Sequence, residues 1–359
     1  MILYALLFSA ILLILGFLTK KTFFYKFIVT VVLLLISVLV ANRPIDGDVA
    51  TYRNDTQVYS QFIECNKYST IDDCNKSIGA PSNEVLLGLF SKLAASVTDA
   101  PHFVVFFLVS GLFCVSCYFF YSSLKIFFPL AITILIFLGQ FWEFNANVLR
   151  QTLSASLFLF VISHYIYNKY TYKRRLALLS FGVLMHSTSF VYFIVHLLSK
   201  YANVIFLYII FCFSLFFGDG LLALIVKMLD SLSLPFSFDL LIKINNYEYT
   251  YGKMESFLTV IGKVNIVLIL ALIYYQKKLN CEYFTYIYKA ILLLLIIGSF
   301  FSGTAVSYRV INVISLILLY LILHPIFRGY YSCSILLLIF IIWNGFVFVA
   351  GDGFALRYF

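Results

Sequence analysis

Apolar runs of about twenty residues recur along the whole chain, and they constrain its fold more than any other feature. A helix of that length crosses the hydrocarbon core of a bilayer, where unpaired backbone groups cost several kcal/mol each. The runs leave 63% of the residues hydrophobic and only 11% charged, which is more apolar side chain than a water-soluble core uses. The sequence therefore predicts an all-α, polytopic transmembrane helix bundle forming one integral membrane domain over residues 1–359.

The distribution of cations gives these spans an orientation. Lysines at 20 and 21 and the arginines at 174 and 175 lie in two short connections, and the positive-inside rule places both in the cytoplasm. The N-terminus and the C-terminus are then periplasmic. We expect ten full spans, at 2–18, 27–41, 102–121, 128–143, 147–168, 203–225, 257–275, 287–303, 308–324 and 332–350.

The stretch from Leu176 to Lys200 does not fit a simple span. Lys277 and Lys278 must also be cytoplasmic, which fails if this stretch crosses the membrane once. We predict a re-entrant broken helix pair, 176–185 and 190–199, that meets at His186-Ser187-Thr188-Ser189. A break at Gly218-Asp219-Gly220 is the competing solution. Broken backbone at membrane depth is tolerated where it lines a cavity, so the break also indicates a site.

Two long connections are expected on the periplasmic side. The first covers 42–101 and contains a short amphipathic helix over Glu84–Val97, which is too short to span and is expected to lie on the membrane surface. The second covers 227–256. Cys65 and Cys74 lie in the first loop, in a compartment where disulfides persist, and we predict that they are bonded.

Polar residues at helical spacing mark the fifth span. Asn147, Arg150, Gln151 and Ser154 follow the pattern i, i+3, i+4, i+7 and predict one polar stripe near its outer end. An ionisable residue in a membrane span is costly and is a functional candidate by default. Arg309 repeats the pattern at the outer end of a later span. Two such arginines on different helices could bind a diphosphate through paired hydrogen bonds.

Other polar residues supply candidate bases and binding groups. Arg43, Asp46, Asp48 and Tyr52 open the first periplasmic loop, where a solvated loop is the alternative reading. His186 sits at the predicted break. The five histidines form no metal-binding spacing, and no P-loop, Rossmann fingerprint or nucleophile elbow occurs, so we expect no cofactor or metal. The cations are spread among short loops, which disfavours nucleic acid as a partner.

These sequence elements, in their order along the chain, resemble the EpsG-like group of Wzy O-antigen and exopolysaccharide polymerases. The most specific elements are Asn147-x-x-Arg150-Gln151 and His186-Ser187-Thr188-Ser189, with a basic pair between them. The looser elements are an Arg/Asp loop and Tyr52 after the second span, Glu84 at the start of a short helix, and a late Arg309. Asp46 and Asp48 compete for one family position.

The resemblance implies a metal-independent glycosyl transfer at the periplasmic face of the bacterial inner membrane. The donor would be a glycan on undecaprenyl diphosphate and the acceptor a lipid-linked repeat unit, with a chain-length regulator as a possible partner. Arg150 and Arg309, with Arg43, would bind the diphosphate, and Asp48, Asp46, Glu84 or His186 would be the base. The alternatives are an O-antigen ligase, a flippase or other transporter, and a membrane acyltransferase.

Overall fold

The computed structural model describes residues 2–19, 21–42, 70, 71, 73, 85–147, 149–167, 170–184, 186, 188–231, 260–301 and 305–350. Every regular element among these residues is a helix, which confirms the all-α expectation for the described part. The chain divides into two compact units. The first unit contains residues 1–194 and 344–359, and the second unit contains residues 195–343.

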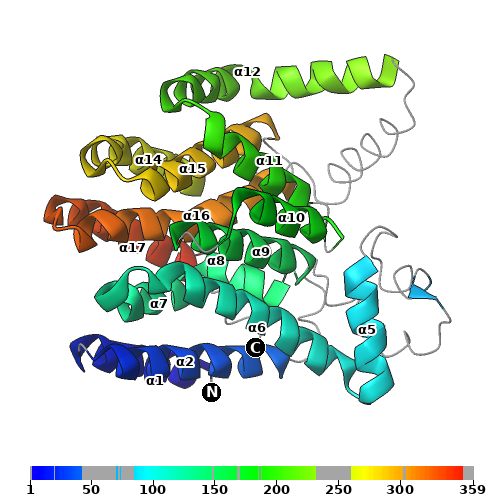
Figure 1. Ribbon diagram of the computed structural model, residues 1–359, viewed down its shortest axis with the longest axis vertical. Coiled ribbons are helices and arrows are strands. Elements are labelled where there is room, and N and C mark those ends of the chain that lie inside the picture. The colour runs from blue at the N-terminus through cyan, green and yellow to red at the C-terminus, as the bar shows by residue number, and fades with distance from the viewer. Residues whose placement is uncertain are drawn as a thin grey trace. The chain divides into compact units, whose positions relative to one another are not determined.

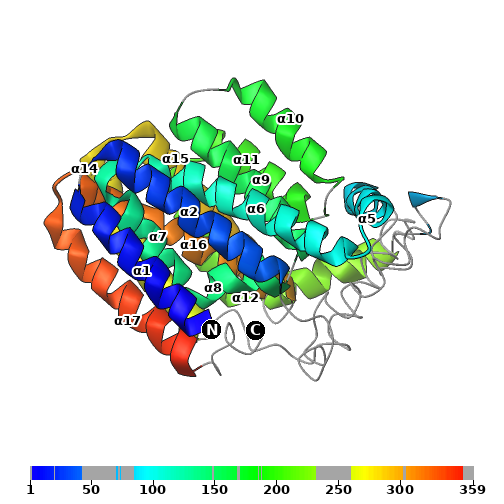
Figure 2. The same ribbon diagram turned by 90° about the horizontal axis from the view of Figure 1, so that it is seen from below.

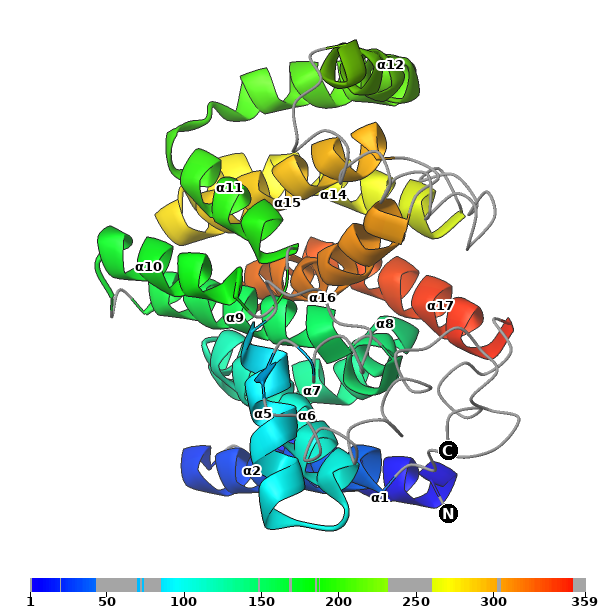
Figure 3. The ribbon, with the colours of Figure 1, turned by 90° about the vertical axis from the view of Figure 1, so that its right-hand side faces the viewer.

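The first unit is a layered set of helices (Figure 1). Helices α1 and α2 run alongside one another, and α6 packs against both α2 and α9 (Figures 2 and 3). Their bounds are α1 (Ile2–Thr19), α2 (Thr22–Ala41), α5 (Val85–Val97), α6 (Pro101–Ser122), η3 (Lys125–Phe127), α7 (Phe128–Ile136), α8 (Gly139–Trp142), η4 (Glu143–Asn147), α9 (Leu149–Ile166) and α10 (Tyr172–Gly182).

The second unit is organised around α16 (Ala305–Phe327). Helix α15 (Glu282–Phe300) packs against α16, α12 (Val204–Ser231) and α14 (Val260–Leu279). In the apolar window of α16, 94% of the residues are buried inside the protein, so α16 forms the core of this unit. The short helix η5 (Tyr331–Cys333) follows it, while α11 (Thr188–Tyr201) and α17 (Ser334–Ala350) each cross a boundary between the units.

The exposed surfaces of these helices are apolar, as a bilayer requires. Phe8 on α1, Phe23 on α2, Ile205 on α12 and Ile335 on α17 each expose more than half of their surface. A helix that is hydrophobic all round lies in a protein core or in lipid. Four described helices are long and apolar enough to cross a membrane, or five if one bent pair counts as a span. The chain is a membrane protein, and ten full spans remain a prediction.

The predicted fourth span, 128–143, is wrong in its geometry. Helix α7 ends at Ile136, and the segment Gly139–Asn145 leaves it at an angle of 79°. The backbone of Leu138 is extended and Gly139 begins the new helix, so the apolar run continues through a point where the helix stops. Trp142 Nε1 donates to the carbonyl of Ile136 at 2.8 Å and satisfies one group freed by the break.

The predicted break in the stretch 176–200 is confirmed. Helix α10 ends at Gly182 and α11 begins at Thr188, so the interruption falls beside and within the expected polar sequence. At the competing position, Gly218–Gly220, the backbone of α12 stays helical, although the ribbon of α12 changes direction along its length (Figures 1 and 3). The return of both segments to one membrane face stays a prediction.

Helix α5 matches the expected amphipathic helix and starts at Val85 rather than at Glu84. It crosses the direction of α2 and α6 beside the first turns of α6 (Figure 1). Ser91 and Ala94 are buried on one face, whereas Leu93 and Val97 are exposed. This orientation suits a helix that lies along the membrane surface.

Candidate functional site

The first half of α9 carries the polar stripe that the sequence predicted. Gln151 and Ser154 are buried, with 4% and 0% of their surface exposed. Asn147 is not part of this helix, because it ends the π-helical turn η4 and α9 begins at Leu149. The expectation of one unbroken helix from 147 to 154 is wrong at its first residue. The side chains of Asn147 and Arg150 lie outside the described part.

The break after α10 contacts this stripe directly. Ser189 Oγ, at the start of α11, donates a hydrogen bond to Ser154 Oγ at 2.7 Å, and both side chains are fully buried. His186, also buried, lies three residues before Ser189 and accepts the Ser189 amide at its own carbonyl. The structure therefore brings together the two sequence elements that the family resemblance ranked as most specific.

Gly182 allows this close approach. A Cβ atom at Gly182 would lie 2.5 Å from Leu157 Cδ2 and 2.9 Å from Ser189 Oγ. Real Cβ atoms essentially never approach other atoms closer than 3.0 Å. The glycine at the end of α10 thus lets the break pack against α9, and any other residue there has to displace one of its neighbours.

The start of α9 also contacts the segment Gly139–Asn145, which we call the bent segment. The Thr152 hydroxyl donates to the carbonyl of Phe144 in η4, and both residues are buried. Asn145 is also buried and accepts from Ser110 Oγ of α6 at 2.8 Å, while its amide donates to Phe141 at 3.3 Å. A π-helical turn in such a place is frequently associated with function.

Several buried polar atoms in and near α9 make no hydrogen bond within the described part of the chain, and three of them are side-chain oxygens of the bent segment, α9 and α11. These three are Gln140 Oε1 in α8, Gln151 Oε1 in α9 and Thr188 Oγ1 at the start of α11. Leaving a buried acceptor unsatisfied costs about 1–3 kcal/mol. A hydroxyl group donates to acceptors of this kind, which makes the start of α9 the candidate site.

The second unit has its own polar cluster near Arg309. Arg309 lies in the second turn of α16 and is half-buried, and Asn312, expected on the same face, is buried. Asn265 of α14 donates to Ser315 Oγ at 2.9 Å. The hydroxyl of Ser307 is buried and has no hydrogen-bond partner among the described residues. The helix that carries Arg309 therefore also carries buried polar groups.

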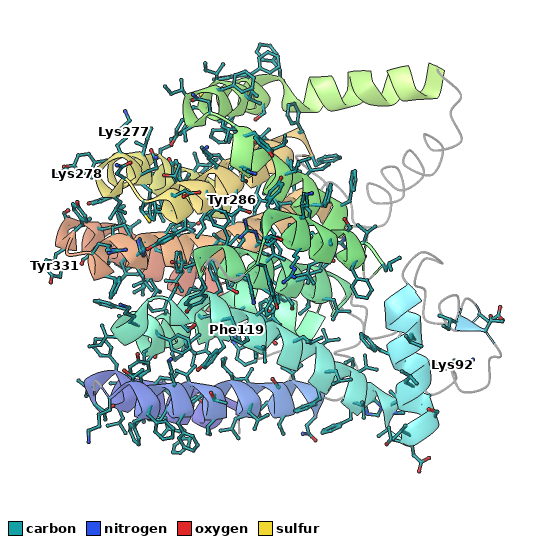
Figure 4. The ribbon with its side chains drawn as sticks, viewed as in Figure 1. Lys92, Phe119, Lys277, Lys278, Tyr286 and Tyr331 are labelled. Atoms are coloured by element: carbon teal, nitrogen blue, oxygen red, sulfur yellow. The ribbon has the colours of Figure 1, made fainter. Side chains whose placement is uncertain are left out.

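One end of the second unit is cationic and aromatic. Lys277, Lys278 and Tyr331 lie at this end (Figure 4). Arg328 Nη2 donates to Tyr283 Oη at 3.1 Å, and this hydrogen bond raises the pKa of the Arg328 guanidinium. Cations and aromatic rings gather at the cytoplasmic boundary of membrane proteins, as the predicted orientation requires.

Several predicted site residues lie outside the described residues. These are Arg43, Asp46, Asp48, Tyr52 and Glu84, together with the predicted disulfide partners Cys65 and Cys74. Among the described residues, no three His, Cys, Asp or Glu side chains lie close enough to hold a metal ion.

The sequence analysis missed Gln140, Asn145 and Ser110. Ser110 and Gln140 are buried in segments that the sequence predicted as plain apolar spans, and Asn145 is buried between two predicted spans. The available signal was the pair Gly139-Gln140 inside an apolar run, because a glycine beside an amide inside a membrane span often marks a break.

A family model described as the EpsG family matches residues 25–352. The match includes α9, the break after α10 and Arg309. No curated protein and no solved structure matches the chain significantly.

Proposed function

This chain belongs to the EpsG family, and on that premise we propose that it is a polysaccharide polymerase of the bacterial cytoplasmic membrane. It transfers the growing glycan from undecaprenyl diphosphate onto a lipid-linked repeat unit at the periplasmic face. The same polymerisation chemistry serves O-antigen and exopolysaccharide.

The hydrogen bond between Ser189 and Ser154 is the observation that carries this proposal. It joins the Arg150-Gln151 helix to the His186 break, although 35 residues separate the two serines in sequence. Packing alone needs no polar contact between apolar helices, and a buried hydroxyl pair between the polar stripe of α9 and the break after α10 favours a site. The contact supports reading these two elements as parts of one catalytic region.

The reaction needs a leaving group, a base and a place for the acceptor. The acceptor hydroxyl oxygen attacks the anomeric carbon of the donor sugar while the bond from that carbon to the diphosphate oxygen breaks. The electron pair leaves with the diphosphate, and a base takes the hydroxyl proton. Arg150 suits the departing diphosphate, because its planar fork of donors matches phosphate oxygens. The leaving group is already on the donor, so no nucleotide sugar takes part.

His186 is the candidate base whose place the structure describes. It is buried and three residues from the serine that contacts α9. The sequence offers three alternatives for the base, namely Asp48, Asp46 and Glu84. It also offers Arg43 and Arg309 as further residues that would bind the diphosphate.

Arg150 variants test the proposal. Arg150→Ala should abolish polymerisation while the protein stays inserted, since loss of one contact to a developing charge commonly costs about a hundredfold in rate. Arg150→Lys should rescue poorly, because it restores charge without the two-pronged geometry. Polymer ladders normalised to the amount of membrane protein measure both. Near-normal specific activity in both variants would remove Arg150 from the mechanism.

A further inference from the structure

Gln140 and Gln151 are the two unsatisfied amides of the candidate site. Gln140 has 5% and Gln151 4% of its surface exposed. The Oε1 atom of each is buried and accepts no hydrogen bond within the described part of the chain. An amide buried in this way costs a membrane protein more than a soluble one, because lipid offers no replacement partner.

The side chains next to these amides in sequence are hydrogen-bonded. Trp142 and Asn145, in the same bent segment as Gln140, both donate to backbone carbonyls. Thr152, next to Gln151, donates to the carbonyl of Phe144. The two unsatisfied amides are therefore not the product of a loosely packed region, and each such group calls for an explanation.

The two glutamines lie close in sequence to one contact between the elements that carry them. Gln140 precedes Phe144 by four residues, about one helical turn, and Gln151 is adjacent to Thr152. The hydrogen bond from Thr152 to Phe144 thus links the bent segment, about one turn after Gln140, to the turn of α9 that contains Gln151.

The predicted orientation places this point in the outer half of the membrane. The segment Lys125–Ile136 rises about 18 Å from the cytoplasmic side at 1.5 Å per residue, out of a hydrocarbon thickness of about 30 Å. Gly139–Asn145 then turns by 79° and runs across that depth instead of continuing outward. Broken helices at such depth characteristically surround a substrate.

We propose that Gln140 and Gln151 form a subsite for the hydroxyl groups of a sugar in the lipid-linked substrate. This inference rests on the proposed function and adds a role for the bent segment, which the sequence reading took for an ordinary span. An amide oxygen accepts a hydrogen bond from a hydroxyl and an amide nitrogen donates one, so an uncharged amide pair matches a sugar ring. Phosphate offers acceptors only and leaves an unsatisfied carbonyl oxygen without a donor, so the diphosphate binds elsewhere.

Binding measurements on the purified full-length protein separate sugar recognition from diphosphate recognition. One probe is undecaprenyl diphosphate-linked repeat unit isolated from cells that lack this protein, and the other is undecaprenyl diphosphate alone. Gln140→Met and Gln151→Met keep the length of the side chain and remove the amide. Each variant should weaken binding of the repeat-unit lipid about tenfold, the effect of one lost hydrogen bond, and change undecaprenyl diphosphate binding less than twofold.

Gln276→Met is the matched control. Gln276 of α14 already donates to Thr285 Oγ1 at 3.1 Å, so its replacement should lower the melting temperature and leave both affinities unchanged. Gln140→Met and Gln151→Met should not lower the melting temperature, because they remove a buried group that has no partner to lose.

Each remaining outcome is decisive. Equal repeat-unit affinity in wild type and both variants overturns the subsite and leaves ordered water as the partner of the amides. A melting temperature lowered as in the control also overturns it, since the amides then have structural partners. Wild-type protein that binds neither lipid counts against the proposed function itself, whereas wild-type protein that binds both lipids equally counts against the subsite alone.

Discussion

Replacing Gly182 by alanine tests whether the break after α10 packs closely against α9. The added Cβ would lie 2.5 Å from Leu157 Cδ2 and 2.9 Å from Ser189 Oγ, so one neighbour has to move by about 1 Å to restore ordinary contact. The leucine methyl group is the end of a flexible side chain, but Ser189 is held by its hydrogen bond to Ser154. Overpacking of this kind costs about 1–3 kcal/mol.

The assay compares Gly182→Ala with Gly111→Ala in detergent. Gly111 lies within α6, and a Cβ there meets nothing within 4 Å, so that variant should be neutral or gain about 0.5–1 kcal/mol from helix propensity. We expect Gly182→Ala to unfold at lower denaturant concentration and to lose polymerisation beyond its loss of folded protein, because it displaces Ser189 and the adjacent break.

A second substitution identifies the contact that causes the destabilisation. Leu157→Ala removes the nearest atom, so Gly182→Ala and Leu157→Ala together should destabilise the protein less than the sum of the two single changes. If Gly182→Ala is as stable and as active as Gly111→Ala, the close packing between α9 and the break does not exist, and the candidate site loses its central contact.

The remaining predictions concern orientation, the first periplasmic loop and the second arginine. Cys281 should react with an impermeant thiol reagent only from the cytoplasmic side, and a cysteine introduced at Asp352 only from outside; reversal at either position would refute the orientation. Cys65 and Cys74 should be disulfide-bonded in protein purified without reductant, closing a short loop worth about 2–3 kcal/mol, and mass spectrometry that finds both alkylated would exclude the bond. Arg309→Ala should abolish polymer ladders at normal protein level, and unchanged ladders would leave Arg309 with a structural role only.

The sequence predicted where most of the described helices lie, because bilayer thickness sets the length of the apolar runs. The break after α10 was predictable from two independent signals, the orientation of later lysines and the polar run that starts at His186. The bend after α7 was not predicted, because Phe137 and Leu138 continue the apolar run while their backbone leaves the helix. Hydropathy detects burial in lipid, but it does not detect a change in helix direction.

The candidate site was predicted in separate pieces. Helical spacing singled out Gln151 and Ser154 on one helix, and the polar run singled out Ser189 on another. Their contact depends on the absence of a side chain at Gly182, and the contribution of Gln140 depends on the bend. Neither effect leaves a periodic pattern in the sequence, so the assembly of the site required the three-dimensional arrangement.

Reconstitution of the purified protein in liposomes tests the central claim most directly. The liposomes contain undecaprenyl diphosphate-linked repeat units as the only substrate, with a metal chelator and without nucleotide sugar. A polymerase of the proposed kind predicts a ladder of lipid-linked chains that differ by one repeat unit and the release of undecaprenyl diphosphate. Repeat units that cross the bilayer without elongation would indicate a transporter, and transfer only to an added lipopolysaccharide core would indicate a ligase; either result, from correctly folded protein, contradicts the proposal.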